Sequence, residues 1–212
     1  MPNVLFATRN EHKVAEIRAI LGGQFHCLTL KDFPNAPAVL EDADTFAGNA
    51  SKKAVELARW LAIAHQTSKV QYVLSDDSGL EVDALSGAPG VHSARFAALD
   101  RNENSTDADN NAKLLRLLKD VPDAKRTARF RCVIALVASS TTIPPHLFDG
   151  TCEGRIESNP RGLGGFGYDP LFVPNGFTQS FAELGEAAKN QLSHRAKALA
   201  KLRKFLDSNP SA

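Results

Sequence analysis

Apolar and polar positions along the first part of the chain predict a strand followed closely by a helix. Val4 to Ala7 is a short apolar run, and residues 11–21 then repeat apolar positions at helical spacing. Asn10 is a suitable N-cap for that helix, and Gly22 and Gly23 end it. We therefore expect a strand, a tight polar loop and a helix N-terminus in succession.

The same patterning predicts the other elements and a mixed α/β fold. Further strands are expected at residues 25–30, 70–74 with a continuation at 80–82, 128–138, 147–156 and 170–173, and further helices at 45–64, 91–98, 107–118 and 194–206. The strands at 128–138 and 147–156 read as a hairpin-like pair that stands beside the main sheet. Strands and helices alternate early and a strand pair comes in the middle, which favours a mixed sheet over a purely doubly wound one.

Composition narrows the classes of function. The chain has 212 residues and a formal net charge of +1, which gives no basis for binding a long nucleic-acid backbone. It has no apolar run of membrane-spanning length and no secretory signal, so we expect a cytoplasmic protein with no membrane partner. Its three cysteines are far apart, which predicts reduced, packed thiols rather than disulfides or a zinc site.

The segment from Thr8 to Lys13, Thr-Arg-Asn-Glu-His-Lys, is the first candidate site. A helix N-terminus presents main-chain N–H groups and positive potential to an anion. Lys13 adds a full charge, and the side chains of Thr8 and Asn10 add hydrogen bonds. The alternative is an ordinary capped helix with a solvated lysine.

Two neighbouring carboxylates follow an apolar strand in Ser75-Asp76-Asp77-Ser78-Gly79. Ligands of α/β sheets gather at the carboxyl ends of strands, and a hard cation would offset the repulsion between the two charges. One aspartate would bind metal or water while the other braces the loop. Asp, Ser and Gly also favour turns, so both a simple turn and a ligand-binding site remain possible for this segment.

The residues from Glu41 to Lys53 form a third candidate. Acidic residues crowd the start of the helix at 45–64, which is usually only favourable with its dipole. Asn49 and Lys53 lie four apart and share a helix face, whereas Lys52 points elsewhere and is expected to be solvated.

A glycine-rich segment at residues 161–170 contains G-x-G-x-x-G by letter count. It does not open a helix, so the dinucleotide interpretation is rejected. Glycines let the backbone approach a flat ligand, and Phe166 can offer its ring to a base. The alternative is a flexible loop with a core phenylalanine.

Lys189, His194 and Arg195 form the last cluster, expected at the start of the final helix. Cations there oppose the helix dipole, so an anionic or electron-rich group should face them. Arg195 can donate a fork of hydrogen bonds to a purine carbonyl edge. The alternative is a basic surface patch. No P-loop motif and no zinc-type His or Cys pairs are present.

Taken in order and spacing, these segments resemble one family over nearly the whole chain: the Ham1-like inosine/xanthosine triphosphate pyrophosphatases. The resemblance is carried by FATRNEHKVAEI, LEDADTFAGNASKKA, LSDDSGLEVDALSGAPGVHSARF, FRCVIAL, EGRI, GGFGYDPLFVP and LSHRAKAL. It implies an elongated α/β fold, a mixed β-sheet with flanking helices, and one domain at 1–212 with two lobes around a central cleft. It also implies a homodimer that uses Mg²⁺ to hydrolyse dITP, ITP, XTP and dXTP to the monophosphate and pyrophosphate.

The resemblance also implies roles for individual residues. Asp77 resembles the acceptor of a proton from the attacking water, and Glu41 and Asp77 resemble the metal carboxylates. The residues similar to substrate contacts are Thr8, Arg9, Asn10, Glu11, His12, Lys13, Lys53, Ser78, Phe166, Gly167, Tyr168, Asp169, Lys189, His194 and Arg195. Two positions depart from the family pattern: Gly48 replaces a common glutamate, and Arg9 stands where small or polar residues are usual.

Selectivity for the purine is expected to come from the 6-oxo group. Arg195, His194 or nearby amides would donate hydrogen bonds to the oxygen and leave an adenine amine unpaired. Two rival functions stay open: a non-catalytic nucleotide-binding module, and a pyrophosphatase for pyrimidine or methylated nucleotides. The presence of Glu41, Asp77 and the two lysines argues against the module, because a pure binder has little use for a water-activating carboxylate.

Overall fold

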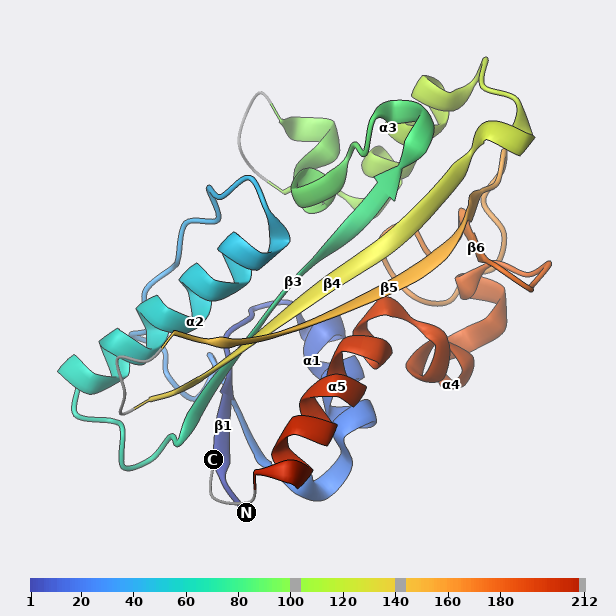
Figure 1. Cartoon of the computed structure of the whole chain (residues 1–212). Helices are drawn as coiled ribbons and strands as arrows, with labels where there is room; N and C mark the ends of the chain where they lie inside the picture. Colours follow the sequence, from blue (N-terminus) through green and yellow to red (C-terminus); the bar gives the residue numbers. More distant parts are fainter. Residues whose placement is uncertain (100–103, 140–143, 210–212) are drawn as a thin grey trace. The chain divides into compact units, whose positions relative to one another are not determined.

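A computed structural model of the chain describes residues 1–99, 104–139 and 144–209 and contains a mixed sheet with flanking helices (Figure 1). The strands are β1 (Asn3–Phe6), β2 (His26–Thr29), β3 (Tyr72–Val82), β4 (Thr127–Ala138), β5 (His146–Ile156) and β6 (Phe172–Pro174). The helices are α1 (Glu11–Leu21), α2 (Phe46–Ile63), α3 (Asp107–Leu118), α4 (Phe181–Leu192) and α5 (His194–Ser208). Short 3₁₀ helices lie at Gly22–Gln24, Asp83–Leu85, Gly90–Ala98 and Asp123–Lys125.

The six strands form one sheet in the order β2-β1-β3-β4-β5-β6. β1 runs parallel to both β2 and β3, whereas β5 and β6 are antiparallel, so the sheet is mixed as expected. The expectation that β4 and β5 stand beside the main sheet is wrong, because both are inner members of it. β4 is apolar at every position from residue 132 to 138 and buried from 132 to 137, as a strand segment covered on both sides must be.

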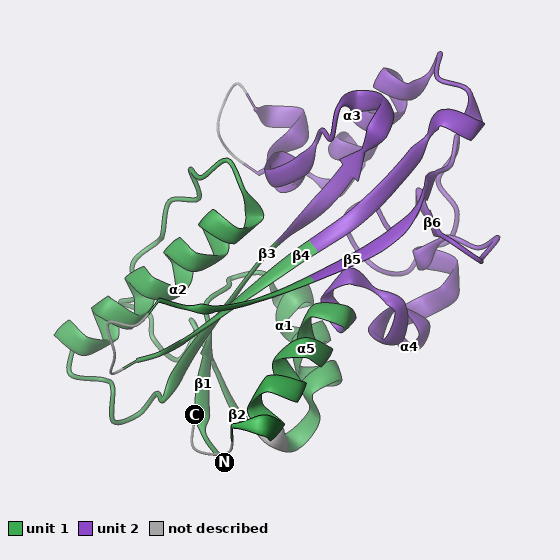
Figure 2. Ribbon diagram, in the orientation of Figure 1, with its two compact units in different colours: residues 1–77, 132–149, 197–212 green, residues 78–131, 150–196 purple. Residues whose placement is uncertain are grey.

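The chain divides into two compact units, coloured separately in Figure 2. The first comprises residues 1–77, 132–149 and 197–212, and the second comprises residues 78–131 and 150–196. The boundary passes through β3, β4 and β5, so each of these strands gives residues to both units.

In the first unit, helices lie on both faces of the sheet. The chain runs from β1 through α1 to β2 on one side of β1, and returns through α2 to β3 on its other side. Right-handed crossovers in opposite directions place the two helices on opposite faces. Figure 2 shows this arrangement, with α5 on the same face as α1. The core of that face contains residues of α1, α5 and alternate strand positions: Val4, Phe6, Ile17, Leu21, Leu74, Cys132, Ile134, Leu136, Ala198, Leu199 and Leu202, among others.

The second unit has its own core, rich in aromatic side chains. Phe130 of β4 packs against Phe172 and Phe181, with ring centroids 4.7 and 6.2 Å away. Leu114 and Leu118 bring the apolar face of α3 into the same cluster. Three rings of this size bury a large apolar area and fix the relative positions of β4, β6 and α4 within the unit.

The three cysteines carry thiols and are not joined in disulfides, as the sequence predicts. Cys132 and Cys152 are buried and Cys27 is half-buried. Within the part of the chain that the structure describes, no helix is both long and apolar enough to cross a membrane.

The Asp-Asp-Ser-Gly segment lies inside β3, so the turn alternative is wrong. Tyr72 to Val82 is one continuous strand. A Cβ added at Gly79 would lie 2.5 Å from the carbonyl oxygen of Gly90 and 2.4 Å from Oγ of Ser93. Gly79 is therefore required by the close approach of the segment at residues 90–93, and the strand continues in spite of its turn-like composition.

Helix α4 was not predicted, and it contains Lys189. The helix starts with a capping box in which Ser180 Oγ accepts a hydrogen bond from Glu183 N, while the Glu183 carboxylate accepts one from Ser180 N. Lys189 lies in its last turn, where a cation is favourable with the dipole. The expectation that Lys189 sits at the start of the final helix, against the dipole, is therefore wrong, whereas α5 does begin at His194.

We predict that Gly79→Ala lowers the free energy of unfolding by about 1–3 kcal/mol, because the new methyl group must displace the Gly90 carbonyl or the Ser93 hydroxyl. Gly23→Ala is the matched control, since a Cβ there meets nothing within 4 Å and φ is −83°. Urea unfolding of both variants checks this. Equal stability of the two would show that the segment at residues 90–93 yields freely to the added methyl group.

Candidate functional site

The loop between β1 and α1 is built by local hydrogen bonds. Asn10 caps α1: its Oδ1 accepts a hydrogen bond from the Lys13 amide at 3.1 Å. The Asn10 amide in turn donates to Thr8 Oγ1 at 3.2 Å. The predicted cap is confirmed, and the loop is held in one shape at the carboxyl end of β1, next to the positive end of a helix.

The other side chains of this loop point in different directions. Arg9 donates to the main-chain oxygen of Ala36 at 3.3 Å, so it braces the following loop. Glu11 is exposed and pairs with Lys31, which holds the pKa of the Glu11 carboxyl below its usual value. His12 is exposed. Of the six residues, Lys13 is the one whose side chain reaches the next strand of the sheet.

Asp76 and Asp77 lie side by side on β3 and face opposite sides of the sheet, because successive residues of a strand alternate. Asp76 faces α1: its Oδ1 lies 2.5 Å from Lys13 Nζ, and its Oδ2 accepts a hydrogen bond from the Cys132 thiol at 3.0 Å. Asp76 is 1% exposed and Lys13 is half-buried, so the carboxylate end of this ion pair is shielded from water. The sequence left the role of Asp76 open; in the structure it holds Lys13.

Asp77 faces α2, where Asn49 and Lys53 meet it. Asn49 Nδ2 donates to Asp77 Oδ2 at 3.1 Å, and Lys53 Nζ lies 3.9 Å from Asp77 Oδ1. Lys53 Nζ also donates to Glu41 Oε2 at 2.7 Å and to the main-chain oxygen of Asp76 at 2.7 Å. One ammonium therefore lies within reach of both carboxylates that the sequence predicts as metal ligands.

The environment of Asp77 raises its pKa from an ordinary 3.8 to about 6. Burial is the main cause, because it disfavours the charged form. The charges of Lys53 and Lys13 and the hydrogen bond from Asn49 act in the opposite direction, and the charge of Glu41 adds to the increase. A carboxylate of this kind is ionised at neutral pH and still basic enough to accept a proton.

Asn49, which the sequence placed on the same helix face as Lys53 but not among the expected substrate or metal contacts, is a residue of this site. Besides its bond to Asp77, its Oδ1 accepts a hydrogen bond from the Ala43 amide at 2.9 Å. Asn49 thus ties the loop that carries Glu41 to the strand that carries Asp77. Its spacing of four from Lys53 was the available signal, because residues one helical turn apart share a face.

Two neighbouring features of α2 also have structural explanations. Lys52 pairs with Asp42 at 2.6 Å on the surface, apart from the Lys53 cluster. A Cβ at Gly48 would lie 2.7 Å from the Cβ of Ala43. The departure from glutamate at Gly48 therefore gives the loop at residues 41–45 room to pack against the helix.

The second unit brings together the remaining predicted residues. Arg195 is 1% exposed and donates to Ser78 Oγ at 2.8 Å. His194 stacks on Phe130 with ring centroids 4.8 Å apart. Both side chains belong to the first turn of α5, where Ser193 Oγ accepts a hydrogen bond from the Ala196 amide. The surface-patch alternative for these two side chains is wrong, because both are buried.

Phe166 to Asp169 form a tight strip held by Lys189. Asp169 Oδ2 accepts hydrogen bonds from the Phe166 amide at 2.9 Å and from Lys189 Nζ at 2.5 Å. The same ammonium lies 4.2 Å from the centre of the Phe166 ring. Tyr168 is buried and donates through its hydroxyl to the Ser93 carbonyl at 2.9 Å, so Phe166, which is half-buried, is the aromatic side chain of the strip that a ligand can reach.

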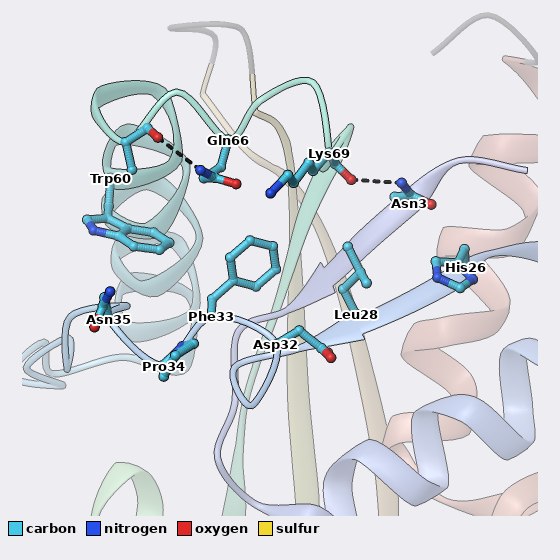
Figure 3. Close-up of a pocket in the computed structure, with 11 residues that line it drawn as sticks. Asn3, His26, Leu28, Asp32, Phe33, Pro34, Asn35, Trp60, Gln66 and Lys69 are labelled. Atoms are coloured by element: carbon cyan, nitrogen blue, oxygen red, sulfur yellow. Dashed lines mark hydrogen bonds between the residues drawn. The ribbon is translucent and has the colours of Figure 1, made fainter.

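A pocket of about 640 Å³ lies elsewhere in the first unit (Figure 3). Its lining includes Leu28 of β2, Trp60 of α2 and Phe33 of the loop after β2, and the Phe33 and Trp60 rings meet edge to face with centroids 6.1 Å apart. None of the predicted site residues lines this pocket.

We predict a pH-dependent stability difference between the metal-free protein and Asp77→Asn. The native state keeps the Asp77 proton up to about pH 6, whereas the unfolded chain releases it near pH 3.8, so the stability that this group contributes falls as pH rises through that window. The free energy of unfolding of Asp77→Asn, relative to that of wild type, should therefore increase by on the order of 2–3 kcal/mol between pH 4 and pH 7.

Urea unfolding with a chelator at several pH values measures this difference. Asp42→Asn serves as the control, because pairing with Lys52 lowers the pKa of Asp42, and its effect should have the opposite sign. A pH-independent gap between wild type and Asp77→Asn would show that Asp77 titrates normally.

Comparisons with known proteins identify the family of the chain. The model of the Ham1 family matches residues 4–205. The chain is 48% identical over 205 residues to a dITP/XTP pyrophosphatase of Desulforamulus reducens, covering 96% of this chain and 95% of the relative.

Two solved structures give the same result. A HAM1 protein from Coxiella burnetii matches with a TM-score of 0.83 and 37% identity, over 98% of this chain and 100% of the other. A nucleoside-triphosphatase, or dITP/XTP pyrophosphatase, from Mycobacterium abscessus matches with a TM-score of 0.71 and 38% identity, over 94% and 98%. The fold, the sequence motifs and the near-complete coverage together show that this chain belongs to the Ham1 family.

Proposed function

We propose that the protein hydrolyses non-standard purine nucleoside triphosphates, namely dITP, ITP, XTP and dXTP, to the monophosphate and pyrophosphate, and so removes them from the nucleotide pool. The observation that carries this proposal is the cluster of Glu41 from the loop before α2, Lys53 from α2 and Asp77 from β3. It joins a cation and a basic carboxylate, the groups that metal-assisted phosphoryl chemistry requires. The relatives named dITP/XTP pyrophosphatases support the choice of substrate.

The donor set around Lys53 fits Mg²⁺. Glu41 and Asp77 offer carboxylate oxygens close to a single ammonium, and Mg²⁺ prefers hard oxygen ligands of this kind. Among the described residues, no group of three or more His, Cys, Asp or Glu side chains forms a metal cage. Two carboxylates with water and substrate phosphates match the usual way in which Mg²⁺ binds in nucleotide enzymes.

In the proposed reaction, water adds to phosphorus, the α–β anhydride bond breaks and pyrophosphate leaves. Asp77 takes the proton of the attacking water. Asn49 holds the Asp77 carboxylate in place, because its Nδ2 donates a hydrogen bond to Asp77 Oδ2. Bound Mg²⁺ supplies neutralisation of the charge on the phosphate oxygens. Lys13, Lys53 and the first-turn amides of α1 stabilise the departing pyrophosphate, and Thr8 to His12 shape the loop that carries those amides.

We assign the nucleoside to the residues of the second unit. Phe166 offers its ring to the purine, and Gly167, Tyr168 and Asp169 fix the strip on which the ring is carried. Lys189, His194 and Arg195 supply donors for a 6-oxo group, and Ser78 is oriented by Arg195. Adenine would place an amine against these donors and leave buried groups unpaired. We also propose that the protein assembles as a homodimer in the cytoplasm, in keeping with the family resemblance.

Release of pyrophosphate across a panel of ITP, dITP, XTP and the four standard deoxynucleotides tests the substrate class. With Mg²⁺, kcat/KM for the 6-oxo non-standard purines should exceed that for dATP by about 100-fold or more, with one pyrophosphate formed per monophosphate. Equal rates on all nucleotides would contradict the selectivity, and a preference for pyrimidines would move the protein to a different pyrophosphatase class.

Two substitutions test the chemistry. Asp77→Asn should lower kcat for dITP by about 100- to 10,000-fold while the protein stays folded, because the base is lost. Glu41→Gln should raise the Mg²⁺ concentration needed for half-maximal rate by about tenfold, because one charged ligand is lost. Lys52→Ala, which removes a surface pair, is the control. Near-normal turnover in Asp77→Asn would remove that residue from the mechanism.

A further inference from the structure

The main chain at Gly167 is held from outside the strip by helix α3. The Gly167 amide donates to Asp107 Oδ2 at 2.6 Å, and Asn111 Nδ2 donates to the Gly167 carbonyl oxygen at 3.0 Å. Asp107 and Asn111 lie four residues apart, one helical turn, and so share a face of α3. Both polar main-chain groups of one glycine are thus taken by two side chains of a single helix.

The hydrogen bonds with Asp107 and Asn111 act at Gly167, which lies between the two aromatic residues of the strip. Gly167 has φ of +63°, a conformation that other residues rarely adopt. On one side of it is Phe166, whose ring lies over Lys189, and on the other is Tyr168, whose hydroxyl is anchored on Ser93. With Tyr168 fixed, the orientation of the Gly167 peptide decides where the Phe166 backbone, and hence its ring, is carried.

Asn111 does not give this position of the fold the greatest possible stability. Its Oδ1 is buried, and none of the described residues donates a hydrogen bond to it. A buried carbonyl oxygen without a donor costs free energy that an apolar side chain of similar size avoids. The benefit of the amide at this position is therefore its single bond to Gly167.

We propose that Asn111 is a positioning residue for the purine base, and that it acts by holding the Gly167 peptide so that the Phe166 ring is preorganised to stack on the base. This inference rests on the proposed function, in which Phe166 contacts the nucleotide. Asn111 sets affinity for the nucleoside part of the substrate and leaves the phosphate chemistry of Asp77 untouched. Preorganisation of this type improves binding because less order has to be imposed when the ligand arrives.

Two variants separate this role from a structural one. Asn111→Leu removes the donor and also the unpaired oxygen, so its melting temperature should equal or exceed that of wild type. Asn111→Asp keeps the shape of the side chain but cannot donate to the Gly167 carbonyl. In both, KM for dITP and the dissociation constant of dIMP should rise about tenfold, the effect of one lost hydrogen bond, while kcat stays within about twofold.

The controls use the phosphate part of the ligand and the rest of the helix. The inhibition constant of inorganic tripolyphosphate, which has no base, should be the same in wild type and both variants. Arg116→Ala, at an exposed position further along α3, should leave every parameter unchanged. Binding of dIMP is measured by calorimetry and does not require turnover.

Unchanged dIMP affinity in both variants overturns the role of Asn111, and so does a loss of tripolyphosphate affinity or a fall in melting temperature that matches the loss of dIMP affinity. A wild-type protein that binds dIMP but releases no pyrophosphate from dITP overturns the proposed function while leaving the effect of Asn111 measurable. Weaker dIMP binding with intact stability and intact tripolyphosphate binding supports the inference.

Discussion

Alternation along β3 is the constraint on which the first unit depends. Asp76 and Asp77 are neighbours in sequence, yet their carboxylates emerge on opposite faces of the sheet and meet lysines from different helices. The right-handed crossovers of α1 and α2 provide one helix for each face. Two adjacent carboxylates that would repel each other on one surface are thereby separated and separately paired, which makes it possible to bury both.

A cation held by a carboxylate recurs at three places in the molecule. Lys13 is held by Asp76, Lys53 by Glu41 and Lys189 by Asp169, and each of these lysines is a proposed nucleotide contact. The long lysine side chain has considerable rotamer freedom, and an ion pair with a carboxylate removes much of it before the ligand arrives. The result in each unit is a rigid cation at a defined position.

Local signals made part of this structure predictable from the sequence. The bounds of α1 and α3 agree with the sequence-based ranges because caps such as Asn10 act within one turn of the chain. The continuity of β3 was not predictable, since Asp, Ser and Gly all favour turns. Pairing with neighbouring strands and the close contact at Gly79 override that preference.

Other features depend on contacts between distant segments. Helix α4 was missed although its capping box at Ser180 and Glu183 is visible in the sequence; Gly185, with φ of +78°, interrupts the helical pattern behind it. The candidate residues were named from motifs, but their partners were not: Asp76 for Lys13, and Asn49 for Asp77. The face of the sheet that Asp76 or Asp77 occupies can be predicted only if the segment is known to be a strand, and the sequence allowed a turn there.

The division of labour between the two aspartates is tested most directly by measuring KM for dITP and the Mg²⁺ requirement in Asp76→Asn. Released from its ion pair, Lys13 should lose its fixed position, so KM should rise by about tenfold while the Mg²⁺ concentration for half-maximal rate stays that of wild type. A shift of the Mg²⁺ requirement with KM unchanged would mean that Asp76 itself serves the metal, and would contradict the separation of roles across the sheet.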